Sequence, residues 1–185
     1  MTARDFASQG NVMTITLYAA TIPSYCQILE AVSGLVGKAE AYCDEAGIDH
    51  GDFIQARLAD DMLPFAYQVK STAVHSLGAI EGVRRGLFSP DRTPPPESFV
   101  ALKERIAAAL AGLRTIEPSE MESFVGRDMR FEAGDFIMNF TADDFLLSFS
   151  QPNFYFHAAT TYDILRWKGV SVGKRDFLGQ PRMKA

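Results

Sequence analysis

The chain has 185 residues, 47% of them hydrophobic and 22% charged, with a formal net charge of −5 and a pI near 5.2. This length suits a single domain that buries its own core. A net negative charge does not indicate the positively charged surface that proteins use to bind DNA or RNA. No apolar run approaches the ~20 residues of a membrane span. The N-terminal sequence MTARDFASQGNV lacks the apolar stretch of a secretory signal, so we expect a cytoplasmic protein.

A long first helix is predicted from Thr21 to about Gly47. Its apolar stripe repeats every seven residues, at Ile22, Leu29, Val36 and Cys43, with Tyr25, Val32 and Ala39 interleaved. Cys26 and Cys43 would lie roughly 25 Å apart on this helix, too far for a disulfide. We interpret them as small buried thiols, with a reactive thiol as the alternative.

A second helical pattern runs from about Phe53 or Leu58 to Arg85. Its apolar stripe comprises Leu58, Met62, Phe65, Val69, Ala73, Ser76, Ile80 and Val83. Pro64 lies inside this pattern, and a proline there should start, kink or re-phase the helix.

The stretch SPDRTPPPES interrupts the helical pattern, and a third helix follows it from Glu97 or Ser98. The core face of this helix is predicted to be Phe99, Leu102, Ile106, Ala109, Leu110 and Leu113. Alternating apolar residues on either side of Gly134 and Asp135 then predict a short β-hairpin. Thr141 is expected to cap a single turn or short helix.

The fourth long helix is expected to run from about Pro152 to Gly169. Its broad inward-facing arc comprises Phe154, Phe156, His157, Ala158, Thr160, Thr161, Ile164, Leu165 and Trp167. The Phe-rich segment that leads into it, from Phe136 to Phe156, is interpreted as core and subunit contact rather than a cofactor pocket. Four helices with a hairpin before the last describe a mainly α four-helix bundle.

His157 is predicted to face the bundle interior, whereas the polar strip that contains His75 could face a neighbouring helix or a solvent-filled cleft, so the two histidines could meet inside the bundle. His157 falls near the middle of the inward arc, and His75 joins Asp61 and Gln68 in a polar strip at a spacing of seven on the second helix. His50 belongs to a polar turn and should be solvated.

The sequence also resembles a known group of proteins. The segments LYAATIPSYCQILEAVSGLVGKAEAY, ARLADDMLPFAYQVKSTAVHS and NFYFHAATTYDILRWKGVSVGKRDFLG are similar to an uncharacterised bacterial family within the DinB/YfiT-like superfamily of putative metalloenzymes. The resemblance implies a DinB-like four-helix bundle, frequently dimeric, over residues 14–179. Residues 1–13 would be a flexible leader and residues 180–185 a tail.

The resemblance also implies a metal site. Better-known superfamily members hold a divalent metal with one histidine on the second helix and two, four residues apart, on the fourth; some are thiol-dependent transferases or hydrolases. His75 matches the second-helix ligand and His157 the first ligand of the fourth-helix pair, but Thr161 stands where the third histidine is expected. A threonine hydroxyl is a poor ligand for zinc or nickel, so a third ligand would have to be a carboxylate such as Asp61 or Asp163.

His157 therefore has three interpretations. It is a core histidine bonded to Tyr18, Gln68 or a backbone carbonyl, a ligand in an altered metal site, or a general base or substrate-orienting group in a metal-free pocket. The GKRD segment, from Gly173 to Asp176, either holds an anion or packs back on the bundle with Asp176 paired to a base.

Two functions follow as expectations. The first is a transferase or hydrolase that depends on a divalent metal (zinc, nickel or iron) or a thiol cofactor, with an incomplete histidine site at His75 and His157. The alternative is a metal-free dimeric protein that binds a small molecule or another protein and has no catalytic activity. A homodimer is compatible with both. A third ligand near the histidines would favour the first, and a Thr161 packed among apolar neighbours would favour the second.

Overall fold

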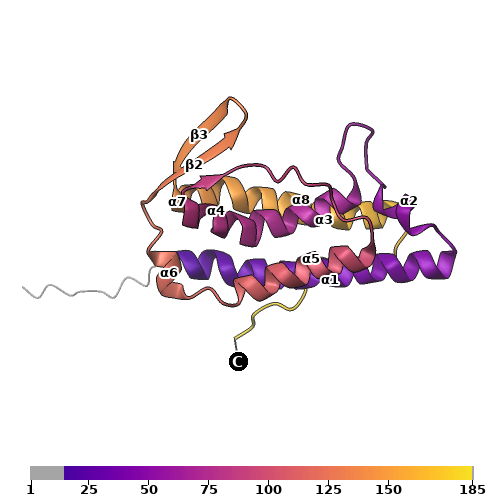
Figure 1. Ribbon diagram of the computed structural model, residues 1–185. Helices are drawn as coiled ribbons and strands as arrows, with labels where there is room; N and C mark the ends of the chain where they lie inside the picture. The colour runs from indigo at the N-terminus through magenta and orange to yellow at the C-terminus, as the bar shows by residue number, and fades with distance from the viewer. Residues whose placement is uncertain (1–14, 185) are drawn as a thin grey trace, which may run out of the picture.

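The computed structural model describes residues 15–184, and the expected leader over residues 1–13 lies outside this range. Four long helical segments form two layers. α1 (Leu17–Ala46) lies beside α5 (Phe99–Leu113), and above them the helix that begins with α3 (Phe65–Ala73) lies beside α8 (Gln151–Trp167) (Figure 1). This confirms the prediction of a mainly α four-helix bundle.

The ends of α1 and α5 follow from local chemistry. The Thr16 hydroxyl accepts a hydrogen bond from the Ala19 amide, and α1 ends at Gly47 in the left-handed conformation, with φ of 65°. Ser98 caps α5 in the same way as Thr16 caps α1. All six residues of the predicted core face of α5 are buried: Phe99, Leu102, Ile106, Ala109, Leu110 and Leu113.

The expectation that the second helix begins at Phe53 or Leu58 is wrong. A short helix, α2 (His50–Ile54), is followed by a loop, and the long helix begins only after Pro64. Proline disfavours the helical conformation of the residue before it but suits a helix start, so Pro64 separates the two segments. Leu58 and Asp61 are consequently exposed in the loop, and Asp61 does not share a helix face with Gln68.

This second long helix has three parts, α3, the π-helical turn η1 (Val74–Gly78) and α4 (Ala79–Arg85). α4 ends at Gly86, which has φ of 72°, and the chain turns into the two-residue strand β1 (Leu87–Phe88). The sequence pattern did not predict β1, which pairs in parallel with strand β2 (Asp128–Ala133). The proline-rich segment (residues 89–97) then crosses the bundle to α5 (Figure 1).

A β-hairpin projects from one end of the bundle, as predicted (Figure 1). β2 (Asp128–Ala133) and β3 (Phe136–Thr141) pair antiparallel, with Ala133 opposite Phe136 across the Gly134–Asp135 turn. Gly134 has φ of 64°, which a residue with a side chain rarely adopts. A short helix, α6 (Pro118–Glu122), links α5 to the hairpin.

The fourth long helix begins ten residues earlier than expected. α7 (Ala142–Asp144), the π-helical segment η2 (Phe145–Ser150) and α8 are continuous, and Thr141 caps their common start. Pro152 therefore lies inside a helix. Its ring crowds the preceding turn and it donates no hydrogen bond, and the wider π turn directly before it accommodates both effects.

The inward-facing arc of α8 is narrower than predicted. Phe154, Ala158, Ile164 and Leu165 are fully buried, and Thr160 and Thr161 are buried too. Phe156 and Trp167, at the edges of the predicted arc, are more than half exposed, so their placement on the inward face was wrong. Phe136, at the hairpin tip, is exposed as well, whereas Phe145 of the same Phe-rich segment is buried in the core.

The C-terminal segment packs back on the bundle, as one of the two interpretations of GKRD expected. α9 (Lys174–Leu178) lies against α1, where Asp176 pairs with Lys38 at 2.7 Å and accepts a hydrogen bond from the Gly173 amide. Cys26 and Cys43 are both free thiols, half-buried and buried respectively. Within residues 15–184 no helix is long and apolar enough to cross a membrane.

Candidate histidine site

His75 and His157 lie side by side in the structure. His75 belongs to the π turn η1 and His157 to α8, and their ring centroids are 5.6 Å apart with an interplanar angle of 19°. The sequence prediction that the two histidines could meet inside the bundle is therefore confirmed. His50 lies elsewhere, half-exposed and bonded to Asp44.

Each histidine is held by an oxygen atom at Nδ1. His157 Nδ1 lies 2.7 Å from Gln68 Oε1, and Gln68 Nε2 donates to the Leu63 carbonyl, which fixes the amide with its oxygen towards the imidazole. An amide oxygen only accepts, so His157 Nδ1 carries the proton. One interpretation of His157, a bond to Gln68, is thereby confirmed.

His75 is held in a similar way, but by a longer hydrogen bond than that of His157. Its Nδ1 lies 3.3 Å from the Ser150 hydroxyl, and that hydroxyl donates its only proton to the His75 backbone carbonyl at 3.0 Å. Ser150 must therefore accept from Nδ1–H. In the neutral form of both rings the Nε2 lone pair is then free, which is the arrangement that second-shell oxygens give to metal-binding histidines.

Both imidazoles are neutral at pH 7. Burial lowers the pKa of His75 to about 3, with a smaller contribution from the neighbouring His157, and burial lowers the pKa of His157 to about 4. A neutral imidazole can act as a metal ligand without first losing a proton. As a general base it would be weak, because its pKa lies far below the working pH.

The two rings line a cavity of about 190 Å³. Its other walls are aromatic and polar: Tyr67, Lys70, Ser71, Val74, Phe88, Pro90, Asp91, Phe131, Phe149 and Asn153. Phe88 and Phe149 contact the His75 ring, with centroids 5.6 and 6.2 Å away, and Tyr67 meets His157 edge to face. The cavity can hold a small molecule with a flat or apolar part.

A buried lysine ties the proline-rich segment across this cavity. Lys70 is 2% exposed, and its ammonium donates to the carbonyl oxygens of Asp91 at 3.0 Å and Thr93 at 2.6 Å, and pairs with the Asp91 carboxylate at 3.0 Å. Burial by itself would raise the pKa of Asp91, but hydrogen bonds from Thr93 and Lys70 outweigh it and keep that pKa below its ordinary value. Sequence reasoning missed both residues; the one available signal was a lysine on the inner side of an otherwise apolar helix.

The third ligand expected from the resemblance is missing at each predicted position. Thr161 is fully buried, does not line the cavity, and donates its hydroxyl proton to the His157 carbonyl at 2.9 Å. Asp61 is exposed in the loop before α3, and Asp163 is exposed on the outer side of α8. Among residues 15–184 no group of three histidine, cysteine or carboxylate side chains is placed to hold a metal ion. A metal beside these two rings would therefore have no third histidine, cysteine or carboxylate ligand from the described residues.

The protein is thus a mainly helical four-helix bundle in which the second and fourth long helices each contribute one histidine to a pair. Residues 17–178 match the family described as a domain of unknown function (DUF1993), and the chain belongs to that family. Its fold is also similar to the crystal structure of a DinB family member from Shewanella denitrificans, with a TM-score of 0.77 and 25% sequence identity over 91% of this chain and 95% of the other. No curated protein matches the chain.

Proposed function

We propose that the protein binds a divalent metal ion through Nε2 of His75 and His157 and uses it on a small organic molecule held in the adjoining cavity. The observation that carries this proposal is that Nδ1 of both rings is hydrogen-bonded to an oxygen atom. Nε2 of each neutral ring therefore keeps its lone pair, and both rings line one cavity. Imidazole nitrogen suits zinc, nickel and iron. A metal there would supply Lewis acidity, as the transferase or hydrolase expectation requires.

The remaining residues would bind and orient the substrate. Phe88, Phe131 and Phe149 offer aromatic surface, and the Asn153 amide and Ser71 hydroxyl offer hydrogen bonds at the cavity wall. The Gln68 amide holds the His157 ring in its Nδ1–H tautomer. With two protein ligands the affinity for metal should be lower than that of a three-histidine site, and open coordination positions would be filled by substrate or solvent.

A second candidate function is metal-free binding of a small molecule in the same cavity. The observation that favours it is Thr161, which is packed and hydrogen-bonded within the helix rather than directed at the histidines. In that case His75 and His157 would accept hydrogen bonds from the ligand through Nε2, since neither ring is a strong enough base for proton abstraction at neutral pH.

Metal analysis separates these two functions. Protein without a His-tag is loaded with Zn²⁺ or Ni²⁺, dialysed, and measured by ICP-MS, with isothermal titration calorimetry for affinity. We expect near-stoichiometric metal in the wild type, and its loss in a His75→Ala, His157→Ala double variant. Gln68→Leu should weaken binding by roughly tenfold or more, because it releases Nδ1 of His157.

His50→Ala is the matched control, since it removes the one histidine that lies outside the site. Metal retained equally by the double variant would show that it binds elsewhere. A wild type that binds none, even with excess Zn²⁺ and Ni²⁺, would reject the metal-dependent function in favour of the metal-free one.

We further propose that the protein is a cytoplasmic homodimer. Tyr155 and Phe156 are exposed at adjacent positions of α8, and Trp167 is exposed at its end, so a second copy of the chain could cover apolar surface on this helix. Analytical ultracentrifugation tests this, and Phe156→Ser should shift a dimer towards monomer.

A further inference from the structure

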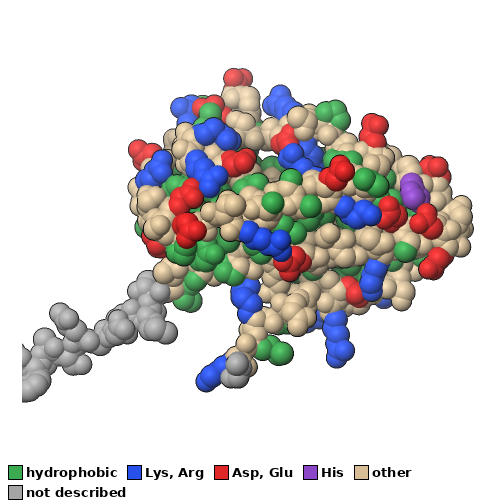
Figure 2. Space-filling model, turned by 60° about the horizontal axis from the view of Figure 1, so that its bottom comes forward, with side chains coloured by type: hydrophobic (Ala, Val, Ile, Leu, Met, Phe, Trp, Pro, Cys, Tyr) green, Lys and Arg blue, Asp and Glu red, His purple; other side chains and the backbone are tan. Residues whose placement is uncertain are grey.

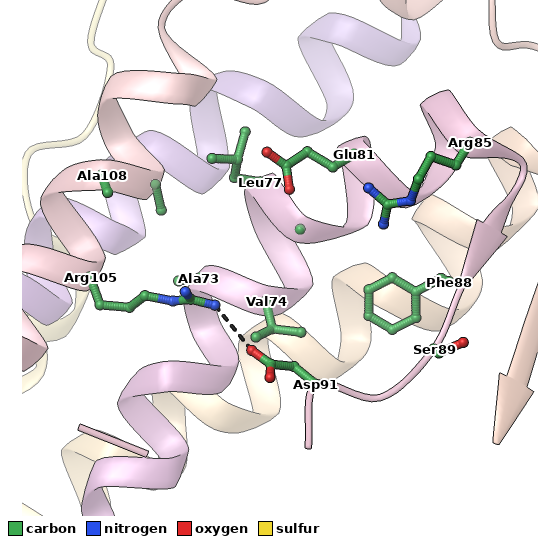
Figure 3. A pocket seen from close by; sticks show the side chains of 12 residues that line it. Ala73, Val74, Leu77, Glu81, Arg85, Phe88, Ser89, Asp91, Arg105 and Ala108 are labelled. Atoms are coloured by element: carbon green, nitrogen blue, oxygen red, sulfur yellow. Dashed lines mark hydrogen bonds and ion pairs between the residues drawn. The ribbon is translucent and has the colours of Figure 1, made fainter. Parts of the chain in front are cut away.

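A second cavity, of about 310 Å³, lies on the other side of Val74 and Phe88 from the histidines. Its floor is the apolar surface of the second long helix, and α5 and the start of the proline-rich segment form its walls (Figure 3). The apolar lining comprises Ala73, Val74, Leu77, Gly78, Phe88, Ala108 and Ala109. This volume is at the lower end of the range for small-molecule sites.

Four charged side chains line the cavity, and two of them are already neutralised. Arg105 pairs with Asp91 at 3.1 Å (Figure 3). The same Asp91 carboxylate accepts hydrogen bonds from the amide and hydroxyl of Thr93 and pairs with Lys70. Because the Asp91 carboxylate already accepts these contacts and Arg105 is paired with it, both side chains are less available to a ligand than an unpaired charge would be.

The other two charges are Glu81 and Arg85, one helical turn apart on α4. Neither has an ion-pair partner within 4.0 Å among residues 15–184, and both extend over the same cavity (Figure 3). The neighbouring Arg84, by contrast, is paired with Glu120 at 2.6 Å and does not line the cavity. The cavity thus presents one carboxylate and one guanidinium beside an apolar floor.

We propose that this cavity binds a small zwitterion with an apolar side group, such as a free amino acid. The ligand's carboxylate would pair with Arg85, its ammonium group with Glu81, and its side group would cover Val74 and Leu77. A simple anion fits less well because Glu81 would repel it, and a simple cation would be repelled by Arg85. A zwitterion matches both charges. This site uses none of the groups proposed to hold metal.

The test is an NMR titration of the isotopically labelled protein with L-leucine, L-methionine and L-phenylalanine. We expect at least one to bind saturably with a dissociation constant below about 10 mM and to shift amide signals of the cavity residues. 3-Phenylpropionate, which lacks the ammonium group, and 2-phenylethylamine, which lacks the carboxylate, should each bind at least about fivefold more weakly than L-phenylalanine. Equal binding of all three phenyl compounds, or binding of none of the amino acids, would overturn the proposal.

Matched variants locate the site. Arg85→Gln and Glu81→Gln, both exposed positions that should not affect folding, are expected to weaken binding by about fivefold, whereas Arg84→Gln should leave it unchanged.

Ala108→Phe should block the cavity, while Ala107→Phe on the same exposed side of α5 lies outside the lining and should not. His157→Ala should still bind the amino acid, which distinguishes failure here from failure of the metal proposal. A loss with Arg84→Gln equal to that with Arg85→Gln would refute the assignment.

Discussion

Acid should destabilise this protein well above the pH at which its carboxylates titrate, because two partly buried histidines are neutral in the fold. The pKa of His75 is lowered to about 3 and that of His157 to about 4, from 6.5 for an exposed histidine. A lowered pKa in the folded state means that the unfolded chain takes up protons first. The contribution of each ring to stability is complete above pH 6.5 and is lost as the pH falls from there towards the folded-state pKa.

The magnitude at pH 5.0 follows from this difference. Both folded-state values lie at least about one unit below 5, so each ring stays neutral in the fold while its unfolded counterpart is almost fully protonated. The gap of 1.5 units between 6.5 and 5.0 corresponds to about 2 kcal/mol per histidine. The two together should remove about 4 kcal/mol between pH 7.5 and 5.0, a large part of the 5–15 kcal/mol typical of a domain.

Urea unfolding followed by circular dichroism at pH 7.5 and 5.0, with EDTA present, measures this loss. The His75→Asn, His157→Gln double variant should lose less than about 1 kcal/mol over the same interval, and His50→Gln, which changes an exposed histidine, should behave like the wild type. The reasoning is refuted if wild-type stability is flat over this interval, or if the double variant loses as much as the wild type. Carboxylates whose pKa is lowered in the fold, such as Asp91, reduce the free energy of unfolding only at lower pH.

Two further predictions concern packing, and urea unfolding at pH 7.5 tests both. Lys70→Met should cost about 2–3 kcal/mol, because it leaves two carbonyl groups of the proline-rich segment without their donor, whereas Lys103→Met, at a partly exposed ion pair, should cost less than about 1 kcal/mol. Equal losses would mean that the buried lysine is not the anchor. Gly82→Ala should destabilise by about 1–3 kcal/mol because its Cβ would lie 3.0 Å from the Phe88 ring. Gly37→Ala, with no atom within 4 Å, should instead stabilise α1 by up to about 1 kcal/mol, and a stabilising Gly82→Ala would contradict the close approach.

Local signals along the chain predicted most of the bundle. The seven-residue stripe of α1, the start of α5 near Ser98 and the Gly134–Asp135 turn each depend on residues close together in sequence, and the structure contains all three. Helical periodicity also directed His157 inward. The apolar stripe wrongly extended the second helix back to Phe53 or Leu58, whereas the helix starts at Pro64, one of the three effects predicted for that proline. The expected start of the fourth helix at Pro152 was wrong, because the helix is continuous through that proline.

The candidate site was predicted in part. His75 and His157 could be chosen because each is a polar residue on or beside an apolar helix face, and Gln68 was among the named partners of His157. Ser150 could not be found, because it meets His75 only through the π segment η2, and no residue pattern marks a change from α to π hydrogen bonding.

The sequence by itself determined that this chain is a four-helix bundle with a hairpin, with His157 facing inward and His75 beside the apolar face of the second helix, since periodicity, caps and turn residues are local properties. Only the tertiary structure decided what surrounds those histidines. The distance from His75 to Ser150, the bond from Lys70 to the proline-rich segment, and the cavity that Glu81 and Arg85 line all depend on how helices far apart in sequence pack together. That packing balances contacts over the whole core, so no single segment specifies it.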